Sequence, residues 1–276
     1  MKKTGQDGLP EWGEETAILL TVDIGNTNIV VGCLDGDKLN FTARLSTGRS
    51  KTPEEYAMLL IQLLSLYHVG REELEGSIVS SVVPVLYPVF RQALATVLGR
   101  PPLLVGPGLR TGLNIRYDNP AQLGSDLVVD AVAAYAQYPA PVLVFDMGTA
   151  TTLSVISEKG DYLGGMIMPG LRLSVDALSS RTSYLPSISF DQPRFLIGTS
   201  TEECMRSGAV YGHAAILDGI ADRVEEALNQ KCTMVTTGGL AALVTPYCRR
   251  DAIYDETLLL KGLQILYEKN KNLAHH

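Results

Sequence analysis

Short apolar segments that end in polar residues recur along this chain, and they predict β-strands. Such segments lie at 17–23, 29–34, 38–45, 77–83, 102–105, 141–146, 151–157, 162–168 and 233–237. The second and third flank the dipeptide Asp35-Gly36, which is typical of tight hairpin turns. The sequence therefore predicts an amino-terminal region that begins with strands joined by short turns.

Segments with helical spacing of apolar residues lie between these strands. Pro53 suits the first turn of a helix, and Thr52 before it suits an N-cap. Ala57, Leu60 and Leu64 then fall on one face of that helix. Further helices are expected at 87–98, 124–138, 170–180, 201–229 and 257–270. Strands that alternate with helices in this way predict an α/β fold with mixed sheets.

One pattern occurs twice in the chain. The segment 22–28, Val-Asp-Ile-Gly-Asn-Thr-Asn, is echoed by 145–151, Phe-Asp-Met-Gly-Thr-Ala-Thr. In both, an apolar strand ends in an aspartate (Asp23 and Asp146), and a glycine, a threonine and another strand follow. Internal similarity of this kind is the signature of repeated architecture, so we expect two similar halves.

The stretch 106–120 is rich in glycine, proline and asparagine, which predicts a loop with a short strand and the boundary between the halves. We expect a first domain at 17–116 and a second at 117–276. Residues 1–16 are mostly polar and read as a flexible lead-in.

Composition narrows the class of protein. The chain has 276 residues, 46% of them hydrophobic, and a formal net charge of −7. Such a chain can bury a core, and its acidic balance argues against a nucleic-acid-binding protein. No apolar run is long enough for a membrane span or a secretion signal, so we expect a cytoplasmic protein. Four scattered cysteines predict reduced, mostly core thiols and no zinc site.

The repeated turn has a chemical interpretation. Backbone N–H groups of a glycine-containing turn, with asparagine and threonine side chains, can surround a phosphate. Asp23 could hold Mg²⁺, which favours carboxylate and phosphate oxygens. An ordinary hairpin with an Asx turn would explain one copy, but the second copy favours two phosphate turns that face each other across a cleft. The expected nucleotide-binding residues are Asp23, Gly25, Asn26, Thr27, Asn28, Gly148 and Thr149.

Asp126 is the candidate for acid–base chemistry. It lies near the start of the helix expected at 124–138. Phosphoryl transfer to an alcohol uses a carboxylate that orients the hydroxyl and accepts its proton. From the residues alone, an acid that complements the helix dipole is the more ordinary interpretation of Asp126.

Three strings together resemble the type III pantothenate kinases of the acetate kinase/hexokinase/Hsp70/actin superfamily. They are Asp23-Ile24-Gly25-Asn26-Thr27-Asn28, Gly148-Thr149-Ala150-Thr151-Thr152 and Gly164-Gly165-Met166-Ile167-Met168-Pro169-Gly170. The resemblance runs from about Leu20 to about Leu266. It implies two duplicated RNase H-like domains with an interdomain cleft, and ATP-dependent phosphorylation of pantothenate, the first step of coenzyme A biosynthesis. It also implies a homodimer.

The resemblance assigns roles to individual residues. Asp126 would be the catalytic base, which reverses the preference for a dipole-compensating acid. Asp146 would bind a monovalent cation, potassium or ammonium, and Thr149 would contact ATP. The implied substrate-binding residues are Tyr117, Gly124, Ser125, Asp126, Leu127 and Thr201. Without the resemblance, Tyr117 would be a loop aromatic packed on the core, and Thr201 a helix N-cap.

The chain departs from the family pattern at two places. Leu127 stands where the family has an arginine that can hold the carboxylate of pantothenate, and Leu153-Ser154 stand where an aromatic residue and an aspartate are common. A nearby cation such as Arg116 could replace the arginine. Three hypotheses therefore stay open: a pantothenate kinase with altered substrate contacts, a kinase for a related small alcohol, and a nucleotide-binding paralog with weak or no catalysis.

Overall fold

The structure is a computed structural model that describes residues 18–36 and 38–273. The lead-in expected at residues 1–16 lies outside the described residues. Two mixed sheets form the framework, one built from residues 18–104 and the other from residues 114–254.

The first sheet has five strands in the order β3-β2-β1-β4-β5. Its strands are β1 (Ile18–Ile24), β2 (Asn28–Asp35), β3 (Lys38–Ser46), β4 (Leu74–Ser81) and β5 (Leu103–Leu104). The first three are antiparallel neighbours, and β4 and β5 run parallel to β1. Helices α1 (Pro53–Leu66) and α2 (Tyr87–Leu98) cover one face, and α1 starts with the capping box that Thr52 predicted.

The second sheet repeats this topology. Its strands are β6 (Asn114–Ile115), β7 (Val142–Met147), β8 (Ala150–Ile156), β9 (Asp161–Pro169), β10 (Thr233–Thr237) and β11 (Ala252–Tyr254). The order is β11-β10-β7-β8-β9-β6, in which β7, β8 and β9 are antiparallel neighbours and β10 and β11 run parallel to β7. Strands β7 to β11 thus correspond to β1, β2, β3, β4 and β5, which confirms the duplicated α/β fold expected from the repeated aspartate turn.

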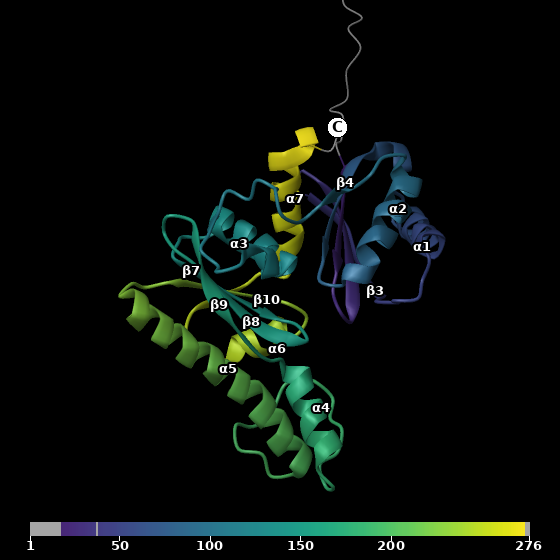
Figure 1. Cartoon of the computed structure of the whole chain (residues 1–276). Coiled ribbons are helices and arrows are strands. Elements are labelled where there is room, and N and C mark those ends of the chain that lie inside the picture. The colour runs from purple at the N-terminus through teal and green to yellow at the C-terminus, as the bar shows by residue number, and fades with distance from the viewer. Residues whose placement is uncertain (1–17, 37, 274–276) are drawn as a thin grey trace, which may run out of the picture.

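Helices α3 (Ser125–Gln137) and α7 (Leu258–Asn270) lie between the two sheets (Figure 1). One face of α3 packs on Val142, Val144 and Ile156 of the second sheet. Its other side and α7 share a core with Leu19 and Ile78 of the first sheet. This shared layer of helices gives each sheet an apolar covering on its inner face.

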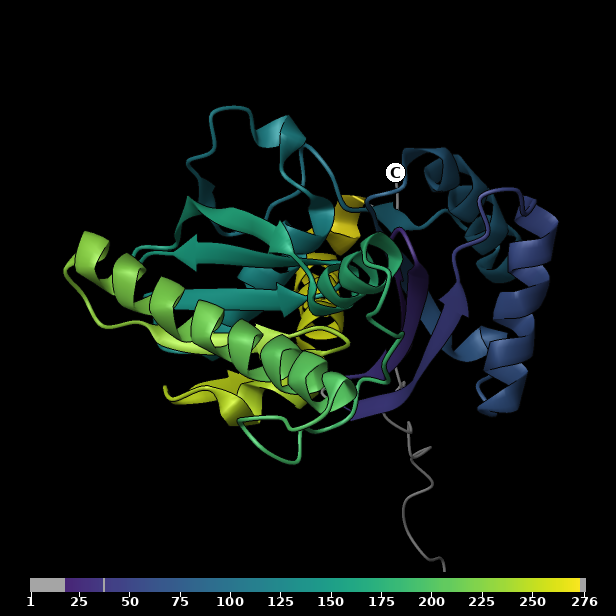
Figure 2. The same ribbon diagram turned by 90° about the horizontal axis from the view of Figure 1, so that it is seen from below.

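The remaining helices cover the outer face of the second sheet. They are α4 (Leu171–Arg181), α5 (Thr201–Leu228) and α6 (Ala241–Val244). After a quarter turn of the molecule, α5 lies at one side and α1 at the opposite side (Figure 2). Short 3₁₀ turns occur at Arg71–Glu73, Pro84–Leu86, Pro120–Gln122, Thr245–Tyr247 and Lys271–Leu273.

Most expected elements are present, with a few differences. The sequence missed α6 and β11, which are four and three residues long and too short to show periodicity. Strand β6 is the short strand expected within the stretch 106–120. Strand β6 pairs with β9 of the second sheet, and α7 packs on strands of the first. The domain limits 17–116 and 117–276 stay a prediction.

The expectation that most cysteines lie in the core is wrong: Cys33 is buried, Cys204 is exposed, and Cys232 and Cys248 are partly exposed. All four are free thiols, as expected. Within the described residues, we find no helix with the length and apolar character that crossing a membrane requires.

Ser125 fixes the start of α3 to the end of β4. Its hydroxyl oxygen accepts hydrogen bonds from Ser80 Oγ at 2.9 Å and from the backbone N of Ser81 at 3.1 Å, and it donates to the backbone O of Ser81 at 3.1 Å. A helix between two sheets is thereby locked to one strand end. This contact fixes the position of the residue that follows, Asp126.

We expect Ser125→Ala to lower the free energy of unfolding by about 1–3 kcal/mol, because it leaves Ser81 N–H without its partner. Urea unfolding followed by circular dichroism measures this. Thr96→Ala is the matched control, since Thr96 hydroxyl bonds only its own helix at Gln92 O and is exposed. Equal effects of the two substitutions would contradict the anchoring role of Ser125.

Candidate active site

The two repeated turns face each other. The hydroxyl oxygens of Thr27 and Thr149 are 3.3 Å apart, although 122 residues separate them in the chain. Each turn is closed by the backbone N–H of its glycine: Gly25 N donates to Asn28 O at 3.0 Å, and Gly148 N donates to Ala150 O at 3.1 Å. A Cβ atom on Gly25 would lie 2.9 Å from that Asn28 oxygen, so the first turn requires glycine.

Four carboxyl groups come together beside these turns. Asp23 and Asp146 are the penultimate residues of β1 and β7, and Asp126 and Asp130 lie on α3. Burial, with added repulsion from Asp126 and Asp146, raises the pKa of Asp23 to about 7. Burial and repulsion from Asp126 likewise raise the pKa of Asp146. The structure therefore gathers acids whose like charges oppose ionisation.

Asp126 lies in the first turn of α3 rather than at its cap, which is Gly124. Its Oδ1 accepts a hydrogen bond from the backbone N of Leu127 at 2.8 Å. Burial raises the pKa of Asp126, and this backbone hydrogen bond opposes the rise. A raised pKa makes the carboxylate of Asp126 a stronger base than an ordinary aspartate, which suits it to accept a proton.

Asp130 is the residue that sequence reasoning missed. It is 2% exposed, and neither carboxylate oxygen has a hydrogen-bond partner among the described residues. Burial raises its pKa well above the usual value, and repulsion from Asp146, Asp126 and Asp23 adds to this. The signal was its spacing of four from Asp126, which places both acids on one face of α3.

The strands under α3 contribute further oxygen atoms. Thr152 pairs across from Asp146 in the β7–β8 register, so both side chains point to the same face of the sheet. The hydroxyl of Thr152 is buried and has no partner among the described residues. Ser154, on the same face, shares a 3.0 Å hydrogen bond with Tyr162 Oη. Position 154, where the family commonly has an aspartate, thus carries a hydroxyl group instead of a carboxylate. Asp130 lies close enough to Tyr162, the partner of Ser154, to help raise the pKa of that tyrosine.

These oxygen donors fit cations that also bind phosphate. One buried carboxylate oxygen of Asp23, Oδ1, has no hydrogen-bond partner among residues 18–36 and 38–273, and such an oxygen suits Mg²⁺. Asp146 and the unpartnered Thr152 hydroxyl are hard oxygen donors of the kind that alkali-metal ions take. Within the described residues, no three acidic, histidine or cysteine side chains form a ready-made metal cluster. Any metal would therefore complete its ligand shell with phosphate or water.

Glycine is also required where β10 ends. Gly238 has φ of +95°, and a Cβ atom there would lie 2.3 Å from Asp146 Oδ1. The backbone after β10 can thus pass directly beside the carboxylate.

The residues expected to bind the alcohol substrate lie around the start of α3. Tyr117 is 38% exposed, so it is not a core aromatic. It lies close enough to the buried Tyr162 for its charge to raise the pKa of Tyr162, after burial as the main cause. Arg116, which could have replaced the missing arginine, pairs instead with Asp161, with Nε and Oδ1 at 3.2 Å. Leu127 is half-buried.

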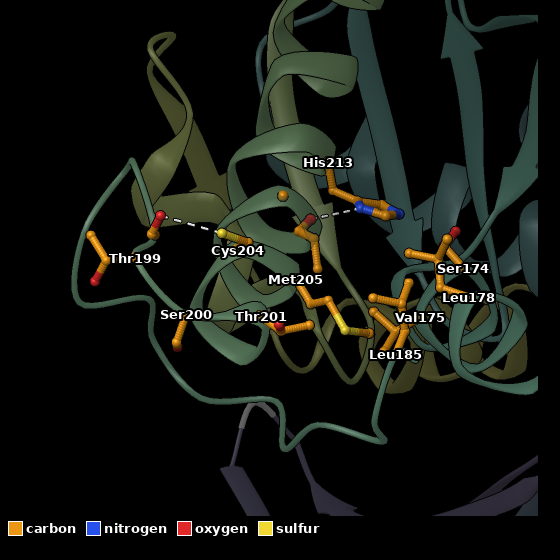
Figure 3. A pocket seen from close by; sticks show the side chains of 13 residues that line it. Ser174, Val175, Leu178, Leu185, Thr199, Ser200, Thr201, Cys204, Met205 and His213 are labelled. Atoms are coloured by element: carbon orange, nitrogen blue, oxygen red, sulfur yellow. Dashed lines mark hydrogen bonds between the residues drawn. The ribbon is translucent and has the colours of Figure 1, made fainter. Parts of the chain in front are cut away.

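Thr201 lies elsewhere, in a cavity of about 750 Å³ between α4 and α5 (Figure 3). It is the first residue of α5, and the cap is Ser200, whose hydroxyl accepts from Glu203 N at 3.3 Å. The N-cap alternative for Thr201 is therefore wrong. Met205 points toward Val175 and Leu185 in this cavity, and its lining contains none of the four aspartates.

The duplicated sheets with two facing turns make up the fold of the actin-like ATPases. MreB5 of Spiroplasma citri superimposes with a TM-score of 0.54 at 12% identity, over 94% of this chain and 98% of that one. The ROK hexokinase of Thermus thermophilus gives 0.50 at 16% identity, over 90% and 98%. At these identities the similarity concerns the fold alone.

Sequence similarity identifies the family within this class. The profile of type III pantothenate kinases matches residues 19–223, and this chain belongs to that family. The type III pantothenate kinase of Moorella thermoacetica is 42% identical over 253 residues, which cover 92% of this chain and all of that protein. The corresponding enzyme of Exiguobacterium is 43% identical over 255 residues, with the same coverage of both chains.

We expect Asp130→Asn to raise the stability of the ligand-free protein at pH 8 by about 1–3 kcal/mol, because it removes a buried carboxyl group that has no partner. The raised pKa means that the folded protein keeps a proton that the unfolded chain has lost. The stability from this group is present below the ordinary carboxyl pKa of about 4 and is lost as the pH rises through the raised value.

Urea unfolding at several pH values between 4 and 8 measures this difference. It should be small at pH 4 and grow toward pH 8. Asp255→Asn is the matched control, because Asp255 is also buried but pairs with Lys261 at 2.7 Å, which lowers its pKa against the effect of burial. That variant should lose stability at pH 8. A destabilised Asp130→Asn protein at pH 8 would contradict our account of Asp130.

Proposed function

We propose that this chain transfers the γ-phosphoryl group of ATP to the primary hydroxyl of pantothenate, giving 4'-phosphopantothenate in the first step of coenzyme A biosynthesis. The observation that carries the proposal is the pair of facing turns, with Thr27 and Thr149 in contact, beside the half-buried Asp126. The membership of the chain in the type III pantothenate kinase family supports the choice of substrate. We place the activity in the cytoplasm.

The phosphates of ATP bind between the turns. Backbone N–H groups and the side chains of Asn26, Thr27 and Asn28 surround them on one side, and Gly148 and Thr149 on the other. Gly25 keeps the first turn tight enough for a close approach. Asp126 orients the hydroxyl of pantothenate and accepts its proton as that oxygen attacks the γ-phosphorus in line.

Two cations assist this reaction in the proposal. Asp23 would hold Mg²⁺ together with the phosphates, and Asp146 would hold a potassium or ammonium ion. Bound there, such ions would supply positive charge that stabilises the transferring phosphoryl group. This arrangement is supported by the buried oxygens of Asp23 and Thr152 that have no hydrogen-bond partner among the described residues, since buried polar atoms are ordinarily paired.

Pantothenate binds near the start of α3, against Tyr117, Gly124 and Leu127. Ser125 contributes to this site by holding the start of α3 in place, because its hydroxyl is hydrogen-bonded to Ser80 and Ser81. Thr201 reaches the substrate of a partner subunit in a homodimer. Exposed apolar side chains around its cavity support such an interface: they include Leu178, Tyr184, Phe195, Leu196 and Ile197.

Asp126→Asn should lower kcat by about 100-fold or more while unfolding stays unchanged, because the amide cannot accept the proton. Pantothenate-dependent ADP release with MgATP, with and without potassium, measures this. Asp251→Asn, at an exposed acid in the loop before β11, is the control. Near-full turnover of Asp126→Asn would make another group the base. Wild-type protein that binds ATP without turning over pantothenate would favour a related alcohol or a non-catalytic role.

Leu127→Arg should lower the KM for pantothenate by about 10-fold, because a guanidinium can pair with the substrate carboxylate whereas leucine cannot. Leu127→Met is the control, since it conserves volume and adds no charge. An unchanged KM in the arginine variant would mean that another group already holds the carboxylate.

A further inference from the structure

Two cationic side chains reach the loops of the candidate site: Arg44, whose Nη1 would lie 3.1 Å from a Cβ atom on Gly239 after β10, and Arg49 at the first turn. Four aspartates surround the site, and the two turns offer neutral groups. Proteins that transfer phosphoryl groups ordinarily aim fixed cations at the phosphates as well as metal ions. Of the residues that the structure describes, Arg49 is the one cationic side chain hydrogen-bonded to either turn, through its Nη2 to Asn26 Oδ1 at 3.1 Å.

The loop that carries Arg49 is fastened to the first turn. Thr47 Oγ1 donates to the backbone O of Gly25 at 2.7 Å, and Thr47 N donates to Thr27 O at 3.0 Å. On the other side, the fully buried Tyr56 accepts from Gly48 N at 3.0 Å and donates to Gly48 O at 2.9 Å. Both residues that precede Arg49 are therefore held, so its side chain starts from a fixed backbone position.

The guanidinium group of Arg49 also has N–H donors that are free to bind a ligand. Arginine carries five N–H donors, and one of them is used on Asn26. In the described part of the chain, Arg49 takes part in none of the ion pairs. The residue is exposed, so a ligand can reach it.

We propose that Arg49 is a phosphate-binding residue of this site, which donates to the terminal phosphate oxygens of a nucleoside triphosphate held between the two turns. The inference rests on the proposed function in one respect, namely that the phosphates of the nucleotide bind between the two turns. Planar guanidinium groups match phosphate oxygens with two parallel hydrogen bonds. Asn26, which accepts from Arg49, keeps its own amide N–H groups for the same ligand.

The test is equilibrium binding of MgATP, MgADP and adenosine by calorimetry, without pantothenate. Arg49→Gln should weaken MgATP binding by about 10- to 100-fold, because it removes charged hydrogen bonds. Adenosine, which has no phosphate, should bind as it does to the wild type. Arg49→Lys should recover part of the lost affinity, since it keeps the charge without the fork of donors.

Lys51→Gln is the matched control. Lys51 lies in the same loop and loses the same charge, but its ammonium group lies over the ring of Tyr56, 5.6 Å from the centroid. It should leave MgATP affinity within about 2-fold of the wild type. A thermal unfolding curve for each variant checks that the turn remains intact.

Three results would overturn the inference. They are an unchanged MgATP affinity in Arg49→Gln, a loss as large in Lys51→Gln, and an equal loss for ATP and adenosine together with lower thermal stability. Because binding is measured without pantothenate, an enzyme inactive on pantothenate would refute the proposed substrate and leave this result standing. A wild-type chain that binds no MgATP would overturn both.

Discussion

The meeting of two equivalent strand ends is the constraint on which the rest of the structure depends. Strands β1 and β7 occupy the same place in the two sheets, and each delivers an aspartate and a turn to the same point. Asp23 and Asp146 then lie near Asp126 and Asp130 with much of their hydration removed. Like charges in a medium of low dielectric repel, so packing elsewhere must hold this arrangement.

The helices between the sheets supply that packing. Both sides of α3 are covered, one by Val142 and Val144 and the other by Leu19 and Ile78, with α7 beside it. Fully burying one side chain of this size contributes about 1.5–3 kcal/mol to folding. The summed contribution of these side chains opposes the cost of burying several carboxyl groups that repel one another. The same layer also carries Asp126, so its position follows from a core rather than from a mobile loop.

The electrostatic cost of the site is linked to its proposed chemistry. Carboxyl groups whose pKa values rise toward neutrality can accept protons, and they also favour bound cations. Arg49 places positive charge beside the first turn, and within the described residues it forms no ion pair with Asp23 or the other aspartates of the site. The cavity around Thr201 lies outside this cluster, with exposed apolar side chains nearby. In the homodimer that we propose, a second subunit would bring the cavity and the cluster together.

Local chemistry was sufficient to predict most of the strands, the long helices, the capped start of α1 and the repeated turn, because periodicity and turn residues act over a few positions. The aspartate repeat even indicated that two halves correspond. Tertiary structure alone decided that Asp130 is buried with no hydrogen-bond partner in the described part of the chain, that Arg116 pairs with Asp161, and that Arg49 reaches the first turn. Each of these depends on contacts between distant segments, which the spacing of residues along one segment does not encode.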